Sequence, residues 1–105
     1  MDKIDIIKEL KELLIENFGD TIDKIILFGS QINGKAKEYS DYDILIILND
    51  DYDWELKNKI ICVCNEIDIK YDIYTDITIM SQSELNSIRG KQPFILAAFE
   101  QGVYI

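Results

Sequence analysis

The sequence has no histidine, a single proline and only two cysteines among its 105 residues. Without histidine, no imidazole can act as a general base or a metal ligand, and carboxylates become the natural candidates for both tasks. Cys62 and Cys64 are two residues apart within a pattern typical of a helix, so their side chains point to different faces. We therefore expect neither a disulfide nor a metal clip, and interpret both as small buried apolar residues.

Basic side chains are also scarce. Eleven Lys and Arg residues stand against 20 Asp and Glu residues, which gives a formal net charge of −9 at pH 7. Tight binding to bare DNA or RNA depends on Lys and Arg replacing phosphate counterions, so direct nucleic-acid binding is not expected. A triphosphate that arrives with a divalent metal is a separate case, because the metal neutralises both the phosphates and the carboxylates around them.

Long apolar runs are absent as well. The longest strongly apolar run, Ile44 to Leu48, is far too short to span a bilayer, and the N-terminus lacks the apolar core of a signal peptide. We therefore expect a cytoplasmic protein without membrane contact. With 48% hydrophobic and 30% charged residues, the composition predicts one folded domain spanning residues 1–105.

The spacing of apolar residues predicts an α/β (α+β) fold, with a small mixed sheet of three or more strands flanked by helices. Apolar residues at intervals of three and four predict helices over residues 3–18, which Gly19 can end, and from Trp54 to Ile67. Runs of strand-forming residues predict strands over 25–28, 43–48 and 69–74, the last continuing toward Met80. Asp51 or Asp53 is placed to cap the second helix.

The last quarter of the chain carries local signals for two more helices. Ser81-Gln82-Ser83-Glu84 has the form of a capping box and predicts the start of a short helix, which Gly90 is expected to end. Pro93 fits the first position of a final helix that covers Phe94 to Gln101. Gly102 is expected at its far end, before a short apolar tail.

A Gly-Ser pair directly follows the first predicted strand. Gly29 lacks a Cβ atom, so a phosphate can approach the main chain there, and Ser30 adds a hydroxyl donor. Taken alone, this pair is more typical of an ordinary turn. Its interpretation as a phosphate site depends on the acidic residues that follow it.

Three aspartates complete the pattern. Asp41 and Asp43 enter the second predicted strand two residues apart, so both carboxylates point to one face while Tyr42 points to the other. Each aspartate alone is commonplace at such positions, and Asp72, in the third predicted strand, is alone best interpreted as solvent-facing. In this order along the chain, however, the three predict a two-metal site, in which two Mg²⁺ ions roughly 3.5–4 Å apart clamp the attacking and leaving oxygens of an in-line displacement.

At these residues the chain resembles the minimal nucleotidyltransferases of the DNA polymerase β-like superfamily, whose pattern is Gly-Ser, a spacer and then Asp-x-Asp. Here ten residues separate Gly29-Ser30 from Asp41-Tyr42-Asp43. Similarity extends to the apolar strand before Gly29, to Tyr71-Asp72-Ile73-Tyr74 and to residues 99–104. The resemblance therefore covers nearly the whole chain.

The resemblance implies a polymerase β-like nucleotidyltransferase fold and a role for each matching residue. By position, Gly29 and Ser30 would hold the triphosphate of ATP, and Asp41 and Asp43 would be catalytic ligands of Mg²⁺. Asp72 would be the third catalytic and metal-binding carboxylate. The family further implies an MntA-type antitoxin, which transfers AMP from ATP to a hydroxyl, usually of a tyrosine, on a HEPN-domain ribonuclease toxin encoded next to it.

The chain departs from the family at one point, and other functions stay open. Many members carry an arginine after Gly-Ser, where this chain has Gln31-Ile32-Asn33-Gly34. The triphosphate would then depend on metal and backbone, with Lys35 or Lys37 as a further candidate, although each lysine alone is better interpreted as a solvated loop residue. One alternative is a non-catalytic antitoxin with a degenerate nucleotide site, which an acidic surface suits against a basic partner. Transfer to a small molecule such as an aminoglycoside ranks lower, because 105 residues leave little room for an acceptor domain. Apolar groups near the tail could serve a homodimer or a heterologous partner.

Overall fold

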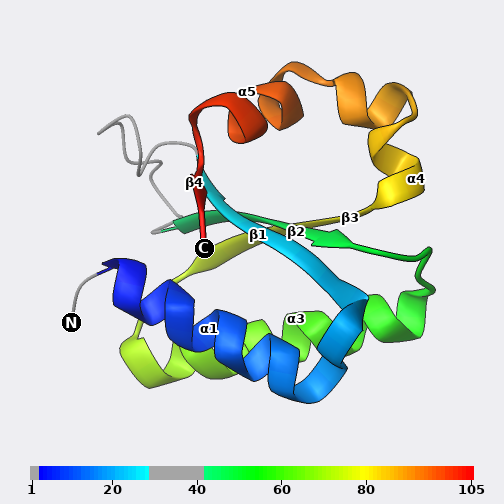
Figure 1. Cartoon of the computed structure of the whole chain (residues 1–105). Helices are drawn as coiled ribbons and strands as arrows, with labels where there is room; N and C mark the ends of the chain where they lie inside the picture. Colours follow the sequence, from blue (N-terminus) through cyan, green and yellow to red (C-terminus); the bar gives the residue numbers. More distant parts are fainter. Residues whose placement is uncertain (1–2, 29–41) are drawn as a thin grey trace.

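The computed structural model describes residues 3–28 and 42–105, which form a sheet between two layers of helices (Figure 1). In chain order the helices and strands are α1 (Lys3–Phe18), the 3₁₀ helix η1 (Gly19–Thr21), β1 (Ile22–Phe28), β2 (Tyr42–Leu48), α3 (Trp54–Tyr71), β3 (Thr75–Ser81), α4 (Gln82–Leu85), the 3₁₀ helix η2 (Ile88–Lys91), α5 (Pro93–Gln101) and β4 (Val103–Tyr104). Among these helices, none is long and apolar enough to cross a membrane.

The sheet has four strands in the order β3-β2-β1-β4. β1 runs antiparallel to β2 and to β4, whereas β2 and β3 are parallel, so the sheet is mixed. This confirms the predicted class, a small mixed sheet flanked by helices. β2 is buried at every residue because it lies inside the sheet and is covered on both faces, which explains its nearly continuous apolar run.

Each face of the sheet has its own apolar core. α1 and α3 cover one face, where Ile25, Ile44 and Ile46 join the larger cluster, and α4 and α5 lie over the other (Figure 1). On that second face Ile26 and Leu45 pack in one cluster with residues of α5. Full burial of one such side chain contributes about 1.5–3 kcal/mol, so the alternation along β1 and β2 stabilises both layers at once.

Several predicted element ends are confirmed. α1 stops at Phe18, and Gly19 has a left-handed φ of +55° that a glycine adopts at little cost. Asp53 caps α3, since its side chain accepts a hydrogen bond of 2.8 Å from the Leu56 amide. The capping box of Ser81 and Glu84 is complete at the start of α4.

The predicted strand over residues 69–74 is wrong over its whole length, and only its continuation toward Met80 is confirmed, as β3. α3 continues to Tyr71, and Asp72 ends it in the left-handed conformation (φ 53°, ψ 52°), where its N–H donates to the Asp68 carbonyl. The alternation of Ile69 and Tyr71 misled the prediction, because Ile69 is 82% exposed on the outer face of a helix. The strand begins only at Thr75, so Asp72 lies on a helix cap and not in the sheet.

Two further predictions need correction. Gly90 does not end the helix that Ser81 opens: α4 stops at Leu85, and Gly90 lies within η2, which Ser87 starts by accepting a hydrogen bond from the Arg89 amide. Cys62 is exposed, and only Cys64 is buried as expected; both are free thiols. Cys62 is exposed because its side chain points away from the sheet on the outer side of α3, as the helical spacing of the pair requires.

Gly102 ends α5 as predicted, but it does not adopt the left-handed conformation that usually favours glycine at the end of a helix. Its φ of −73° is open to any residue. A Cβ atom there would lie 2.3 Å from the Ala98 carbonyl oxygen and 2.4 Å from Cγ2 of Ile26. The absence of a side chain therefore lets the chain pass close to β1 and pair with it as β4.

Candidate functional site

Asp43 is a buried carboxylate near the start of β2, an inner strand of the sheet. It is the second residue of β2 and only 2% exposed. Tyr42 belongs to the core beneath α1 and α3, and alternation along the strand turns Asp43 to the opposite face, with Leu45. The prediction that Tyr42 and Asp43 point to opposite faces is thereby confirmed.

A second carboxylate, Asp76, is the direct neighbour of Asp43 on β3. The two residues are Cα partners in the parallel register of β2 and β3. Paired residues on adjacent strands face the same side, and adjacent strands lie about 4.8 Å apart. Asp76 is exposed, so this pair forms a carboxylate site at the end of the sheet where β2 and β3 begin.

Asp76 was not among the predicted site residues, because the third strand was predicted to start at residue 69 instead of Thr75. Once α3 is extended to Tyr71, the next alternating segment is Thr75 to Ile79, and Asp76 is the acid within it. Ile77 and Ile79 carried a usable signal, because they alternate with polar residues and so predict a strand that contains Asp76.

The other predicted site residues have different positions. Asp72 is exposed on the cap of α3, three residues before β3, and the structure does not bring it onto the strand beside Asp43. Gly29, Ser30 and Asp41 lie outside the described residues. The residues that flank this gap are close together, since Phe28 pairs with Asp43 at the edge of the β1–β2 ladder.

Three side-chain contacts hold the start of β3, beside Asp76, and the end of α3 that precedes it. The Thr75 hydroxyl donates to Oδ1 of Asp68 at 2.7 Å, which ties the first residue of β3 to α3. At the end of α3, Lys70 forms an ion pair of 2.7 Å with Glu9 of α1, and the Tyr71 hydroxyl donates to the same carboxylate at 2.5 Å. The hydrogen bonds from Lys70 and Tyr71 lower the pKa of Glu9, so the carboxylate stays ionised and holds α3 against α1.

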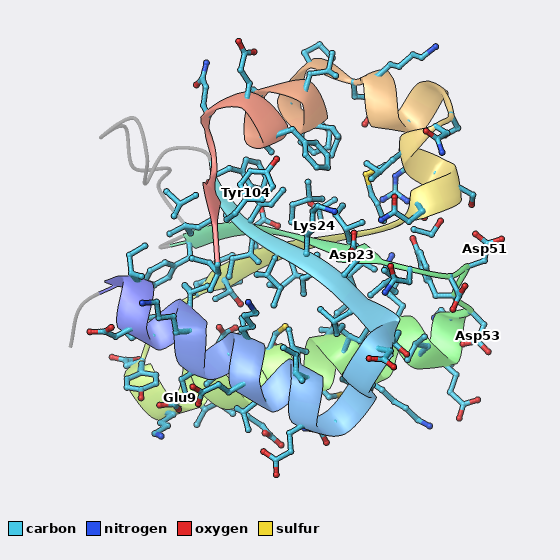
Figure 2. All side chains as sticks on the ribbon, in the orientation of Figure 1. Glu9, Asp23, Lys24, Asp51, Asp53 and Tyr104 are labelled. Carbon is cyan, nitrogen blue, oxygen red and sulfur yellow. The ribbon has the colours of Figure 1, made fainter. Side chains whose placement is uncertain are left out.

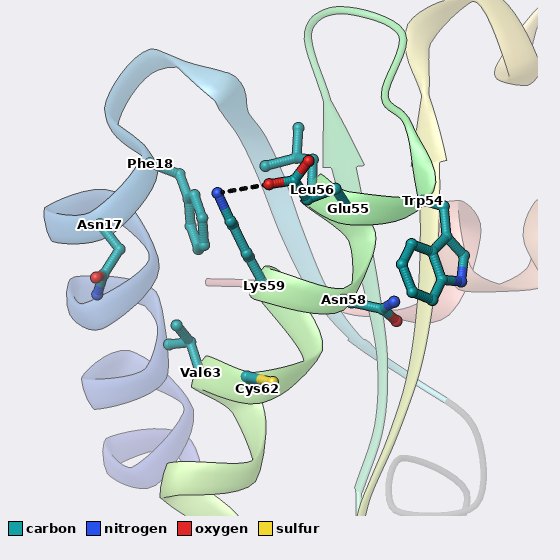
Figure 3. A pocket seen from close by; sticks show the side chains of 9 residues that line it. All are labelled: Asn17, Phe18, Trp54, Glu55, Leu56, Asn58, Lys59, Cys62 and Val63. Atoms are coloured by element: carbon teal, nitrogen blue, oxygen red, sulfur yellow. Dashed lines mark ion pairs between the residues drawn. The ribbon is translucent and has the colours of Figure 1, made fainter.

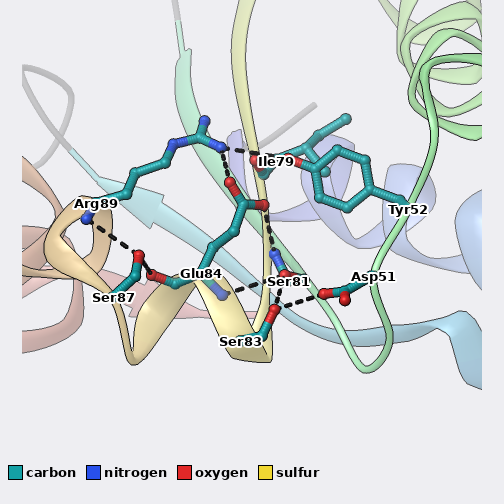
Figure 4. Close-up of polar contacts among 8 residues, drawn as sticks. All are labelled: Asp51, Tyr52, Ile79, Ser81, Ser83, Glu84, Ser87 and Arg89. Atoms are coloured by element: carbon teal, nitrogen blue, oxygen red, sulfur yellow. Dashed lines mark hydrogen bonds and ion pairs between the residues drawn. The ribbon is translucent and has the colours of Figure 1, made fainter.

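The other end of β3 is held by a polar network (Figure 4). The Tyr52 hydroxyl donates to the Ile79 carbonyl at 3.0 Å, and Arg89 donates to both Tyr52 and Glu84. Burial acts to raise the pKa of Glu84, but hydrogen bonds to Tyr52 and Arg89 outweigh it and hold the pKa below its ordinary value. Because both ends of β3 are fixed, its register against β2 is fixed as well.

A groove of about 670 Å³ lies elsewhere, between the end of α1 and the first turns of α3 (Figure 3). Phe18, Trp54 and Val63 contribute its apolar wall, and an ion pair of 3.3 Å between Lys59 and Glu55 crosses its rim. α3 follows the far end of β2. That end is five strand residues, or about 17 Å, away from Asp43. This groove is therefore not built around the carboxylate pair.

The residues that could hold a metal ion are only partly described. Within residues 3–28 and 42–105, no three acidic or cysteine side chains are grouped to hold one ion. Asp43 and Asp76 still supply hard oxygen donors on one face of adjacent strands, which is the donor type that Mg²⁺ takes. The pair therefore fits part of a magnesium shell.

The sequence matches the model of a protein family described as Polymerase beta, Nucleotidyltransferase, over residues 8–99. Two similar proteins come from Methanocaldococcus jannaschii. The proposed protein adenylyltransferase MJ0141 is 40% identical over 73 residues, which cover 70% of this chain and 74% of that protein. The proposed protein adenylyltransferase MJ0604 is 35% identical over 80 residues, which cover 76% and 75%.

Two solved structures share the fold. A proposed nucleotidyltransferase from Sulfolobus solfataricus has a TM-score of 0.59 at 18% identity, covering 95% of this chain and 76% of that one. A mutant of the toxin–antitoxin MntA–HpeT has a TM-score of 0.58 at 23% identity, covering 100% of this chain and 72% of that one. The overall fold described above is thus shared with these two proteins.

Proposed function

The chain belongs to the polymerase beta nucleotidyltransferase family, and from that premise we propose that it transfers AMP from ATP to a hydroxyl group of a partner protein. The partner in this proposal is a HEPN toxin, the acceptor is a tyrosine, and the chain is the antitoxin. The observation that carries the proposal is the in-register pair of Asp43 and Asp76 at the end of the sheet where β1 stops, just before Gly29-Ser30.

Each site residue has a role in this proposal. Gly29 and Ser30 bind the triphosphate through main-chain N–H groups and a hydroxyl. Asp41 and Asp43 are Mg²⁺ ligands, and Asp76 takes the place that the sequence pattern gave to Asp72. When bound, Mg²⁺ neutralises the phosphates and the charge that develops on the attacking and leaving oxygens.

The proposed reaction is an in-line substitution at the α-phosphorus of ATP. The acceptor oxygen forms a bond to the α-phosphorus, the bond from that phosphorus to the oxygen bridging to the β-phosphate breaks, and pyrophosphate leaves. The hydroxyl proton passes to a carboxylate, for which Asp76 is the exposed member of the pair. Asp43, at 2% exposure, is held too firmly to follow the acceptor and suits a fixed ligand instead.

A protein acceptor is supported by two observations. Both M. jannaschii relatives are named as protein adenylyltransferases, and one structural neighbour is a toxin–antitoxin protein. The net charge of −9 favours encounter with a basic protein.

The test is label transfer with purified components. The wild-type chain, Mg²⁺ and α-labelled ATP are incubated with the proposed HEPN partner, and label on that protein is followed by electrophoresis. We expect Asp43→Asn to reduce the initial rate at least about 100-fold, as loss of a group acting on the transition state does. Asp50→Asn, an exposed aspartate in the turn after β2, is the matched control and should leave the rate unchanged.

The same assay distinguishes AMP transfer from the second candidate function, in which the chain is an antitoxin that acts by binding alone. That candidate is favoured by the absence of an arginine after Gly-Ser, where Gln31 stands. A stable complex in which the wild-type chain moves no label would support it and overturn the transfer proposal.

A further inference from the structure

The C-terminal part of the chain forms a surface that is nearly free of charge. Residues 92–105 contain one charged side chain, Glu100, whereas 30% of the whole chain is charged. Large apolar side chains are nevertheless exposed here: Leu96 by 53%, Val103 by 38% and Tyr104 by 51%. We call Leu96, Phe99, Val103 and Tyr104 the α5–β4 surface.

These side chains belong to one continuous area. Leu96 and Phe99 are three residues apart on α5 and so are neighbours on the same flank of the helix. The rings of Phe99 and Tyr104 lie 6.4 Å apart, and the Tyr104 hydroxyl donates to the Phe99 carbonyl at 3.1 Å. Figure 2 shows Tyr104 on β4, below α5.

The exposed apolar residues are not needed to pack α5 against the sheet. Ile95 and Ala98 of α5 are completely buried against the sheet and already supply its apolar contact. Exposed aromatic and aliphatic groups with few charges are the composition of the centre of a protein–protein interface.

The α5–β4 surface lies beside the carboxylate site. Val103 pairs with Leu27 of β1, and the next residue of β1, Phe28, pairs with Asp43. Only β1 separates β4 from β2, so the two strands are about 10 Å apart. A protein bound to the surface would therefore stand within reach of the reacting phosphate.

We propose that the α5–β4 surface is the docking surface for the acceptor protein of the transfer reaction, and this inference rests on the function proposed above. The partner would contribute an apolar patch surrounded by basic residues, because the rest of the chain carries almost all of its net charge of −9. A second copy of this chain fits less well. It would bring the same negative charge, so the two copies would repel each other.

The test compares two apolar-to-acid variants at exposed helix positions. Leu96→Asp places a charge within the surface, and Ile69→Asp does the same on α3, which covers the opposite face of the sheet. Both are titrated calorimetrically against the proposed HEPN partner. We expect Leu96→Asp to weaken binding at least about 10-fold, as residues central to an interface do, and Ile69→Asp to bind like the wild type.

Kinetics distinguish docking from chemistry. Leu96→Asp should raise the KM for the acceptor and leave kcat at saturation and the affinity for Mg²⁺·ATP unchanged. Tyr104→Ala removes an exposed ring from β4 and should also raise the KM for the acceptor. Because this variant adds no charge, it shows whether the effect of Leu96→Asp comes only from its new carboxylate.

The outcomes separate this inference from the proposed function. If both surface variants bind like the wild type, or if the wild type forms no complex with the HEPN protein, the docking inference is overturned. A Leu96-dependent homodimer in sedimentation experiments would also overturn it, in favour of a second copy. A complex that depends on Leu96 but receives no AMP would leave docking intact and overturn the transfer function instead.

Discussion

At the scale of single residues, the difference between Asp72 and Asp76 decides which carboxylate can join Asp43. The two differ by four positions, but Asp72 caps a helix and Asp76 is the strand neighbour of Asp43. Sequence order alone could not separate them, because Asp72 also stood within a segment that alternates between apolar and polar residues. The proposal therefore gives the third role to Asp76.

The two aspartates are separated by a pair of matched variants. Asp76→Asn should lower the rate of AMP transfer by about 100-fold or more, because it removes a carboxylate that accepts a proton. Asp72→Asn should leave the rate unchanged, since asparagine tolerates the left-handed conformation of that cap. Initial rates of label transfer measure both, with thermal unfolding as the check on folding. If Asp72→Asn lost activity while Asp76→Asn kept it, Asp72 and not Asp76 would be the third carboxylate of the site.

The two cysteines should differ in reactivity. Burial raises the pKa of Cys64 to about 12, so its thiolate is scarce at pH 8, whereas Cys62 is exposed. Iodoacetamide at pH 8 should therefore alkylate Cys62 in the native protein and reach Cys64 only after unfolding in urea. Peptide mass mapping gives the site of modification. Equal alkylation of both thiols in the native state would contradict the burial of Cys64.

At the scale of elements, sequence patterns located α1, β1, β2 and α3 because each carries a long or unambiguous apolar period. The boundary between α3 and β3 was lost, since residues 69–74 satisfy the strand period over only three apolar positions. α3 ends where Asp72 adopts the left-handed cap conformation. The ion pair of Lys70 with Glu9 of α1 stabilises this end of the helix from a distant part of the chain, so no local pattern contains it.

Gly102 should be intolerant of a side chain. Gly102→Ala places a Cβ atom within 2.4 Å of both the Ala98 carbonyl and Ile26, so α5 or β4 must move. We expect a loss of about 1–3 kcal/mol in the free energy of unfolding, measured by urea denaturation. Ala97→Ser, an exposed change on the same helix, is the control and should cost much less. An unchanged midpoint for Gly102→Ala would show that β4 is not packed against β1 as described.

The network around Glu84 predicts an acid dependence of stability. Its folded pKa lies below the ordinary value of 4.5, so the unfolded chain binds the proton more readily. The stabilisation is therefore complete above about pH 4.5 and is lost as the pH falls through the lowered pKa.

Glu84→Gln tests this dependence, because glutamine can keep the capping box while losing the charge. The variant should be about 1 kcal/mol less stable at pH 7, a modest value because the Arg89 side chain is 39% exposed, and the gap should narrow below pH 4.5. Urea denaturation at several pH values measures it, with Glu66→Gln, on an exposed position of α3, as the control. A gap that is independent of pH would contradict the role of the Glu84 charge.

At the scale of the whole molecule, apolar patterning predicted the layered architecture but not the order of the strands. Pairing of Tyr104 with Ile26 joins distant parts of the chain, and the short tail carried no strand signal of its own. The same pairing brings the apolar C-terminal residues beside the carboxylate site. Site and candidate docking surface are thus products of topology, which local periods do not encode.

We propose that this chain modifies a partner protein through its carboxylate site. Intact-mass spectrometry of the proposed HEPN partner, co-expressed with the wild-type chain, with Asp43→Asn or with Asp76→Asn, tests this proposal. We expect a mass increase of one or more AMP units with the wild type and none with either variant. An unmodified partner beside the wild-type chain, or equal modification beside Asp43→Asn, would contradict it.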